Sequence, residues 1–210
     1  MAHAFLDIAF TPAVREQQAR LGSAKVYERA LKPEADPSNL LGEAEAKFIE
    51  ARDGFFQATV SETGWPYVQF KGGAAGFLKV LDARTIAYAD LGGNRQYISL
   101  GNLKTDDRVS MILVDYPNRR RLKVFGRVRF VEDDPELVER LMVPAYRARA
   151  ERAVMISVEG IDWNCPAHIP QRLTLEELKA SLEPLRQELA RLTAENESLK
   201  ASLAARTDEI

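Results

Sequence analysis

The stretch that decides the fold runs from residue 64 to residue 129 and reads GWPYVQFKGGAAGFLKVLDARTIAYADLGGNRQYISLGNLKTDDRVSMILVDYPNRRRLKVFGRVR. Short runs of β-branched and aromatic residues alternate in it with turn residues, as is typical of antiparallel strands. At its centre lies the loop Asp90–Gln96, DLGGNRQ, in which two glycines let the backbone turn tightly and approach a ligand closely. This loop is therefore the first candidate for a binding site.

Two cations flank this candidate site. Lys71 ends the strand expected over Trp65–Lys71, and Arg95 lies in the loop itself. Asn94 and Gln96 add amide groups just where a helix is expected to begin. The two cations could converge from neighbouring elements on one phosphate, although an ordinary turn with an exposed arginine is the simpler alternative.

The segment resembles the pyridoxamine 5'-phosphate oxidase-related family of FMN-binding split barrels. In that family, a lysine closing a barrel strand and a short polar loop hold the flavin phosphate; the matching residues here are Gln69–Lys71 and Asn94–Gln96. The likeness continues through the expected helix Tyr97–Leu103 and the strand Leu122–Val131. It implies an α+β protein that is mainly β, a Greek-key antiparallel split β-barrel with flanking helices.

The resemblance also implies a cofactor, FMN, and a site for it. Lys71 and Arg95 would hold the phosphate, and the strand ending in Lys71 would edge the ring system. Arg121 would reach the flavin of a dimer partner, Trp163 would stack on the ring unless it only anchors the connection after the last strand, and His168 would contact substrate. The expected cofactor-binding residues are Val68, Gln69, Phe70, Lys71, Asp90, Asn94, Arg95, Gln96, Ser99, Arg121, Trp163 and His168.

The expected function is that of an FMN-dependent oxidoreductase moving hydride or electrons between a nicotinamide cofactor, NADH or NADPH, or a small organic substrate and an acceptor. No catalytic dyad is visible, and the Arg-x-His pattern that true pyridoxamine phosphate oxidases carry at the C-terminus is missing. The alternatives are a flavin-binding or sensing protein without turnover, a scaffold led by its C-terminal helix, and an F420- or haem-binding split barrel. The expected partner is a second copy of the chain, with flavin at the subunit interface.

Composition argues against several kinds of partner and site. The 210 residues are 46% hydrophobic and 29% charged, with a net charge of −2, which gives no general attraction to nucleic acid or to anionic lipid. A single cysteine allows no internal disulfide, and Cys165 with His168 supplies only two neighbouring metal ligands, so no metal site is expected. Neither a membrane span nor a secretory signal is expected, and the predicted location is cytoplasmic.

The expected organisation has three parts: an N-terminal helical arm over 1–42, a split-barrel flavin-binding domain over 43–173, and a leucine-heptad helix over 174–210. Thr11-Pro12 is a helix start, and the arm would pack on the barrel or a partner or cover a pocket. Within the barrel domain, helices are expected over Glu43–Arg52, over 135–142 and over Ala145–Arg152. The expected strands are Phe55–Ser61, Trp65–Lys71, Gly76–Leu81, Thr85–Asp90, Val109–Val114, Leu122–Val131 and Val154–Glu159.

The last part of the chain carries a heptad repeat. Leucines and one asparagine recur in alternating steps of three and four from Leu175 to Leu203, after a capping box at Thr174–Glu177. Pro184 is expected to kink or restart the helix. Asn196 falls at an a position, which favours a parallel coiled-coil dimer, with a different protein or the chain's own barrel as alternative partners.

Overall fold

The structure is a computed structural model that describes residues 3–28, 30–32, 38–144, 146–164 and 167–207. The chain forms two compact units. One comprises residues 1–115 and 119–169, and the other comprises residues 116–118 and 170–210. Within the described residues, no helix combines the length and apolarity needed to cross a bilayer.

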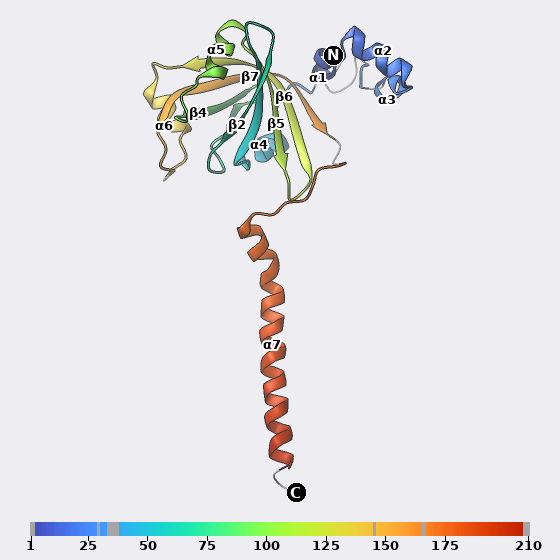
Figure 1. Cartoon of the computed structure of the whole chain (residues 1–210), viewed down its shortest axis with the longest axis vertical. Helices are drawn as coiled ribbons and strands as arrows, with labels where there is room; N and C mark the ends of the chain where they lie inside the picture. The colour runs from blue at the N-terminus through green and yellow to red at the C-terminus, as the bar shows by residue number, and fades with distance from the viewer. Residues whose placement is uncertain (1–2, 29, 33–37, 145, 165–166, 208–210) are drawn as a thin grey trace. The chain divides into compact units, whose positions relative to one another are not determined.

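The first unit is built on one antiparallel sheet in the order β2-β1-β5-β6-β7-β4-β3 (Figure 1). Its seven strands are β1 (Gly54–Val60), β2 (Pro66–Gly72), β3 (Lys79–Asp82), β4 (Thr85–Leu91), β5 (Arg108–Asp115), β6 (Arg120–Val131) and β7 (Ala150–Asn164). Neighbours in sequence such as β1 and β2 pair directly, whereas β4 crosses to pair with β7. The α+β class, the antiparallel split barrel and the long C-terminal helix predicted from the sequence are confirmed.

The sheet curls so that strands distant in the sheet order face each other. The ring of Phe55 on β1 lies 5.6 Å from that of Tyr88 on β4, and the Tyr88 hydroxyl donates to Gln57 at 3.2 Å. Burial raises the pKa of Tyr88, so its hydroxyl stays protonated and keeps donating. The ladder does not close, because β2 and β3 end the sheet order, and the barrel is therefore split.

Alternation along the strands builds the core. On β1 and β5 every second side chain is buried, as the two-residue period of a strand requires. These side chains fill the barrel with those of β4, β6 and β7. The largest fully buried apolar members are Ile49, Phe55, Leu78, Ile86, Met111, Leu113, Leu122, Val124, Val154 and Ile156.

Three helices pack on the sheet or follow its strands: α4 (Glu43–Glu50), α5 (Ile98–Thr105) and α6 (Pro135–Leu141). Each begins where its sequence supplies a cap or a turn. The Glu45 carboxylate accepts from the Gly42 amide at 3.0 Å, and that of Asp134 accepts from the Leu137 amide at 2.8 Å. The cap fixes α6 where Leu141 can be buried against β4 and β7.

The N-terminal segment forms three short helices: α1 (Ala4–Ala9), α2 (Pro12–Arg20) and α3 (Ala24–Tyr27). Thr11 caps α2 as predicted, since its hydroxyl accepts from the Val14 amide. The sequence analysis missed α1, which docks on the barrel where Phe5 stacks on Phe125 with ring centroids 4.4 Å apart. Gly160 permits this contact, because a Cβ there would lie 2.6 Å from the Phe5 amide nitrogen.

The helix expected over Ala145–Arg152 is wrong. Ala145 lies outside the described residues, residues 146–149 are irregular, and β7 begins at Ala150. Here Arg152 pairs with Asp90 on β4, so strand pairing overrides a local composition that favours a helix. The last strand is consequently much longer than the predicted Val154–Glu159, and the other strand ends differ by a few residues.

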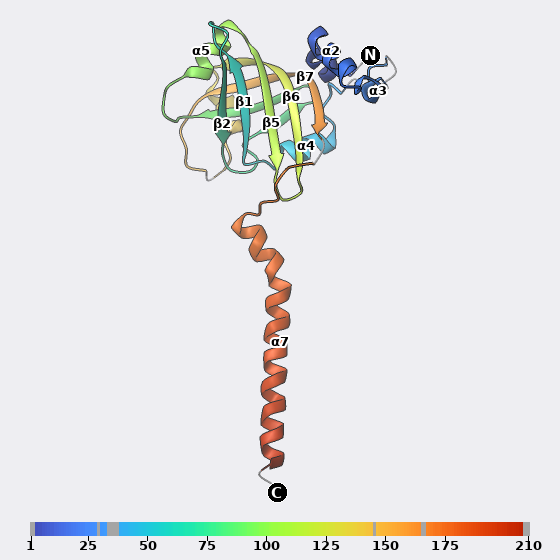
Figure 2. The ribbon, with the colours of Figure 1, turned by 45° about the vertical axis from the view of Figure 1, so that its right-hand side comes forward.

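The second unit contains α7 (Leu175–Thr207), which Figure 2 shows as one long helix. The predicted capping box is present: the Thr174 amide donates to the Glu177 carboxylate at 2.8 Å, and the Glu177 amide donates to the Thr174 hydroxyl at 3.2 Å. A kink or a restart was predicted at Pro184; the helix is continuous through that residue, so it does not restart there, and Figure 2 shows a bend in its first turns.

Candidate functional site

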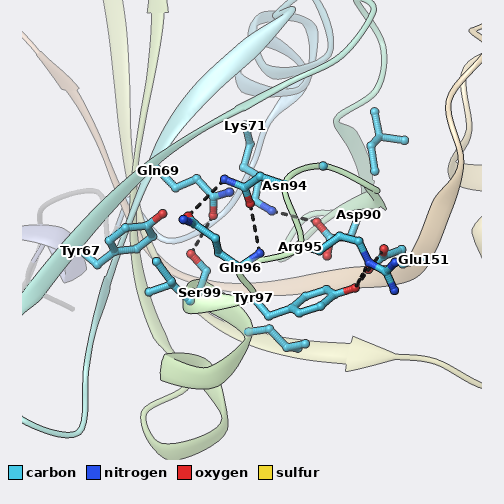
Figure 3. Close-up of a pocket in the computed structure, with 14 residues that line it drawn as sticks. Tyr67, Gln69, Lys71, Asp90, Asn94, Arg95, Gln96, Tyr97, Ser99 and Glu151 are labelled. Carbon is cyan, nitrogen blue, oxygen red and sulfur yellow. Dashed lines mark hydrogen bonds and ion pairs between the residues drawn. The ribbon is translucent and has the colours of Figure 1, made fainter.

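The candidate site is a cavity of about 210 Å³ between β2, the segment that joins β4 to α5, and the start of β7 (Figure 3). It lies where the two ends of the curled sheet approach each other. The lining residues are Tyr67, Gln69, Lys71, Asp90, Leu91, Gly93, Asn94, Arg95, Gln96, Tyr97, Ile98, Ser99, Leu100 and Glu151.

Strand alternation explains what β2 contributes. Tyr67, Gln69 and Lys71 are spaced by two, are half-buried and line the pocket. The side chains between them, Val68 and Phe70, are exposed at 61% and 59% and do not line it. The resemblance assigned these two residues backbone contacts to the ring system, and that role stays a prediction.

A tight loop carries the amides and the second cation. The Asn94 side chain accepts from the Gln96 amide at 3.2 Å and donates to the Gln96 side chain at 3.1 Å. Arg95 and Tyr97 have left-handed backbones, with φ of 60° and 54°, and such residues cost about 1–3 kcal/mol each. Two strained residues in a row of three indicate that the surrounding contacts hold the loop in one shape.

The first turn of α5 points at the same cavity. Ile98, Ser99 and Leu100 line it, so unpaired amides of the helix start lie beside the loop. The Ser99 hydroxyl donates to the Gln69 side chain at 2.9 Å, and Asn102 donates to the Thr59 hydroxyl at 3.0 Å. These bonds fasten α5 to β2 and β1.

A charge network fills the floor of the pocket. Lys71 Nζ lies 2.8 Å from Asp90 Oδ1, which joins β2 to β4 across the split. The guanidinium of Arg152, whose side chain is 10% exposed, lies 3.7 Å from Asp90 and 2.9 Å from Glu151. It also reaches Glu132 at 3.1 Å. Arg152 therefore neutralises carboxylates that would otherwise face one another.

Arg95 is linked to the same network through Tyr97 and Glu151 (Figure 3). Its Nε donates to the Tyr97 hydroxyl at 3.2 Å, and that hydroxyl donates to Glu151 at 3.3 Å. The hydrogen bond to Tyr97 raises the pKa of the Arg95 guanidinium above its ordinary value, so the group stays charged.

The structure thus brings seven of the twelve predicted residues to one pocket. They come from β2, from the end of β4, from the loop and from α5. The seven are Gln69, Lys71, Asp90, Asn94, Arg95, Gln96 and Ser99.

Three predicted residues lie elsewhere in the chain. Arg121 on β6 pairs with Val114 on the outward face of the sheet, and its Nε is buried without a hydrogen-bond partner among the described residues. The Trp163 indole donates to Glu45 at 2.8 Å and packs edge-on against Phe48 at 4.7 Å, contacts that favour the anchoring alternative. His168 is exposed in a turn. Cofactor roles for all three stay predictions.

Four polar or charged residues of the site were not predicted from the sequence. Tyr67 could have been found, since it shares the two-residue period of Gln69 and Lys71. Tyr97, Glu151 and Arg152 offered no such signal, because their roles depend on the loop conformation and on the pairing of β7 with β4.

The remaining motifs have plain structural roles. The glycine-rich segment Gly72–Gly76 begins at the last residue of β2, and residues 73–78 form no strand. No group of three or more metal-ligating side chains gathers among the residues that the structure describes, and Cys165 lies outside them.

Comparison with known structures gives distant likenesses. A protein related to general stress protein 26, of the pyridoxinephosphate oxidase family, from Clostridium acetobutylicum is 14% identical, covering 62% of this chain and 92% of its own (TM-score 0.43). An FMN-binding protein from Syntrophomonas wolfei is 13% identical, covering 73% and 95% (TM-score 0.45). An F420 reductase is 22% identical, covering 59% and 98% (TM-score 0.40). At these TM-scores none of them indicates a ligand for this chain.

Sequence comparison identifies the family. Among curated proteins, no significant match to the chain was found. A family model described as Pyridoxamine 5'-phosphate oxidase matches residues 41–172, which contain all seven strands and every residue of the pocket. Because this match covers well over half of the 210 residues, the chain belongs to the pyridoxamine 5'-phosphate oxidase family.

Proposed function

We propose that this chain binds FMN in the pocket between β2 and the loop before α5, and that it acts as an FMN-dependent oxidoreductase. The observation that carries the proposal is the convergence of Lys71 and Arg95 on one cavity from separate elements. Family membership makes a flavin the first ligand to test.

The lining suits the polar half of FMN. A dianionic phosphate needs cations, which Lys71 and Arg95 supply, and the ribityl hydroxyls need amides and hydroxyls. Asn94, Gln96 and Ser99 offer these groups around the same cavity. When bound, FMN would supply the hydride or electron chemistry; the chain's own residues would bind and orient it.

The two carboxylates of the lining do not prevent anion binding. Asp90 is shared between Lys71 and Arg152, and Glu151 contacts Arg152 and receives the Tyr97 hydroxyl bond. Three cations therefore face two carboxylates. The further carboxylate, Glu132, has a side chain that is 59% exposed and screened by water. Because Arg95 is exposed as well, the network is close to neutral, and the phosphate would be held by the charged hydrogen-bond donors of Lys71 and Arg95 and not by an excess of positive charge.

A second copy of the chain would complete the site. The outward face of β2, β1 and β5 exposes an apolar patch, and its members touch, since the rings of Phe56 and Phe70 lie 5.3 Å apart. The patch consists of Phe56, Val60, Val68, Phe70 and Ile112, each at least 36% exposed. A contiguous apolar face of this kind is typical of a protein interface, and we assign it to the homodimer.

The size of the pocket supports a shared site. Its volume of about 210 Å³ is below the range of roughly 300–1,000 Å³ usual for small-molecule sites, so one chain encloses only part of FMN. Arg121 lies on the same sheet face as Ile112, with a buried Nε that has no hydrogen-bond partner in the described part of the chain. From this position the Arg121 guanidinium would bind the flavin of the second copy.

Absorbance of the purified protein and its titration with FMN test the proposal. Bound FMN should give a yellow protein, and NADH or NADPH should bleach it and air restore the colour if it turns over. Stable colour without bleaching would indicate a binding or sensing protein. Affinity for F420 or haem above that for FMN, or no affinity for any of the three, would contradict the proposed cofactor.

A further inference from the structure

The helix α7 exposes a continuous apolar seam that no residue of its own unit covers. Its members recur in steps of three and four, at the a and d positions of a heptad. They are Leu175, Leu178, Leu182, Leu185, Leu189, Leu192, Asn196, Leu199 and Leu203, and the leucines are 38–71% exposed. Most helical stability comes from packing of an apolar face, so a helix of this design requires a partner.

We propose that α7 pairs with α7 of a second copy of this chain as a parallel, in-register, two-stranded coiled coil. The surface is separate from the flavin pocket, so the inference does not depend on the proposed cofactor. Asn196 is the first reason to expect α7 of a second copy as the partner. At an a position of a parallel pair, two copies of this asparagine meet and bond to each other, and they lose that partner in any other register.

Charge is the second argument. With Asn196 at position a, the e positions carry Lys179, Arg186 and Lys200, and the g positions carry Glu188 and Glu195. One edge of the seam is therefore basic and the other acidic. In a parallel pair each g position faces the e position five residues further along the other helix, so Glu195 meets Lys200, twice by symmetry, and Glu188 meets the neutral Thr193.

An antiparallel pair would place like charges together. In that arrangement e edges face e edges and g edges face g edges. The register with full overlap sets Leu182 against position 199 of the second copy. It also brings Glu188 near position 195 and Lys179 near position 200, and each of these contacts occurs twice by symmetry. These like-charge contacts select against the antiparallel form.

The one intrahelical ion cluster is compatible with the parallel form. Arg191, at a c position, lies 2.8 Å from Glu188 and 3.0 Å from Glu195 within its own helix. All three side chains are more than half exposed, so these pairs contribute little, and Glu195 stays accessible to Lys200 of a second copy.

Disulfide formation in the full-length protein tests orientation and register together. In a Cys165→Ser background, which removes the only cysteine, Asn196→Cys places a thiol in the seam. Ala194→Cys places one at an f position, on the far side of the helix. In the proposed coil the first variant should form a covalent dimer under mild oxidation at least about tenfold faster than the second, because only seam positions bring two Cβ atoms within disulfide reach.

Mixing distinguishes the orientations. Leu182→Cys protein and Leu199→Cys protein, one carrying a size tag, should each cross-link only to itself if the coil is parallel. Cross-linking between the two variants would show an antiparallel coil and overturn the proposal. Equal rates for Asn196→Cys and Ala194→Cys, or no cross-linking at all, would also overturn it and point to another protein as the partner.

Discussion

The two faces of β2 differ in polarity and in what they contact. One face presents Tyr67, Gln69 and Lys71 to a polar, strained and charge-rich pocket. The other presents Val68 and Phe70, exposed and apolar, to solvent. An edge strand can therefore line a pocket with one face and expose an apolar surface on the other, because alternate side chains point in opposite directions.

The cause of the difference is the split in the barrel. A strand inside a closed barrel would bury one face in the core, but β2 pairs only with β1, and its inner face meets β4 through the Lys71–Asp90 contact instead of a ladder. Under the proposed function, substitutions one residue apart on β2 should therefore separate ligand binding from subunit association. The predictions below use that property.

The largest effect should come from the apolar face. In the proposed two-fold interface, Phe70→Glu would bury two carboxylates, one from each copy. The proposed coiled coil of α7 would still hold the two copies together. We therefore expect a monomer only when Phe70→Glu is combined with Leu192→Glu, with a dimer dissociation constant raised at least about a thousandfold. Light scattering over a dilution series measures the mass. Leu81→Glu on β3, also exposed, is the matched control and should leave the native dimer unchanged.

The next effect should come from the pocket face. Lys71→Ala with Arg95→Ala removes both charged donors, each worth about 1.5–3 kcal/mol, so FMN affinity should fall at least about a hundredfold. Quenching of flavin fluorescence measures the dissociation constant. The control, Lys79→Ala with Arg84→Ala, removes the same charges from the β3–β4 hairpin, outside the lining. Equal losses in both double variants would show that only general charge matters.

The third predicted effect is on the free energy of unfolding and arises from the charge network in the floor of the pocket. Arg152→Ala would leave Asp90 and Glu151 without their shared cation, and breaking a buried ion network of this kind should lower the free energy of unfolding by about 3 kcal/mol. Urea denaturation measures the change. Arg147→Ala, at an exposed neighbouring position, should stay within about 0.5 kcal/mol of the native protein, and a similar loss there would refute the assigned role.

The smallest effect compares adjacent residues of β2. Gln69→Ala removes the acceptor of the Ser99 hydroxyl and one amide of the lining, so FMN affinity should fall about tenfold or less. Val68→Ala, one residue away on the other face, should change FMN affinity by less than about twofold if only its backbone meets the cofactor. A larger loss for Val68→Ala would show that the ligand contacts the outward face of β2, which would contradict the proposed site.

The sequence predicted the strands, the loop and half of the pocket lining because these depend on local patterns. The two-residue period placed Gln69 and Lys71 on one face, and the glycines placed the loop. Arg152 could not be found, since residues 147–152 are rich in helix formers and only pairing with β4 places residues 150–152 in a strand. The Lys71–Asp90 contact also escaped, because curvature of the sheet creates it.

The short helix α1 was also not predicted from the sequence, because its position depends on a distant contact. Six residues are too few for a helical period to be read from the sequence, and its place is fixed by Phe5 on Phe125. In contrast, α7 was predicted with its cap, because its repeat persists from Leu175 to Leu203. Elements that owe their position to distant contacts were the ones missed.

The central claim is that Lys71 and Arg95 grip the phosphate of a flavin, and calorimetric titration with FMN and with riboflavin, which lacks the phosphate, tests it most directly. We expect the native protein to bind FMN about a hundredfold more tightly than riboflavin, and the double alanine variant to bind both equally weakly. If the native protein binds both ligands alike, or if the variant keeps its preference for FMN, the phosphate does not lie between these two side chains.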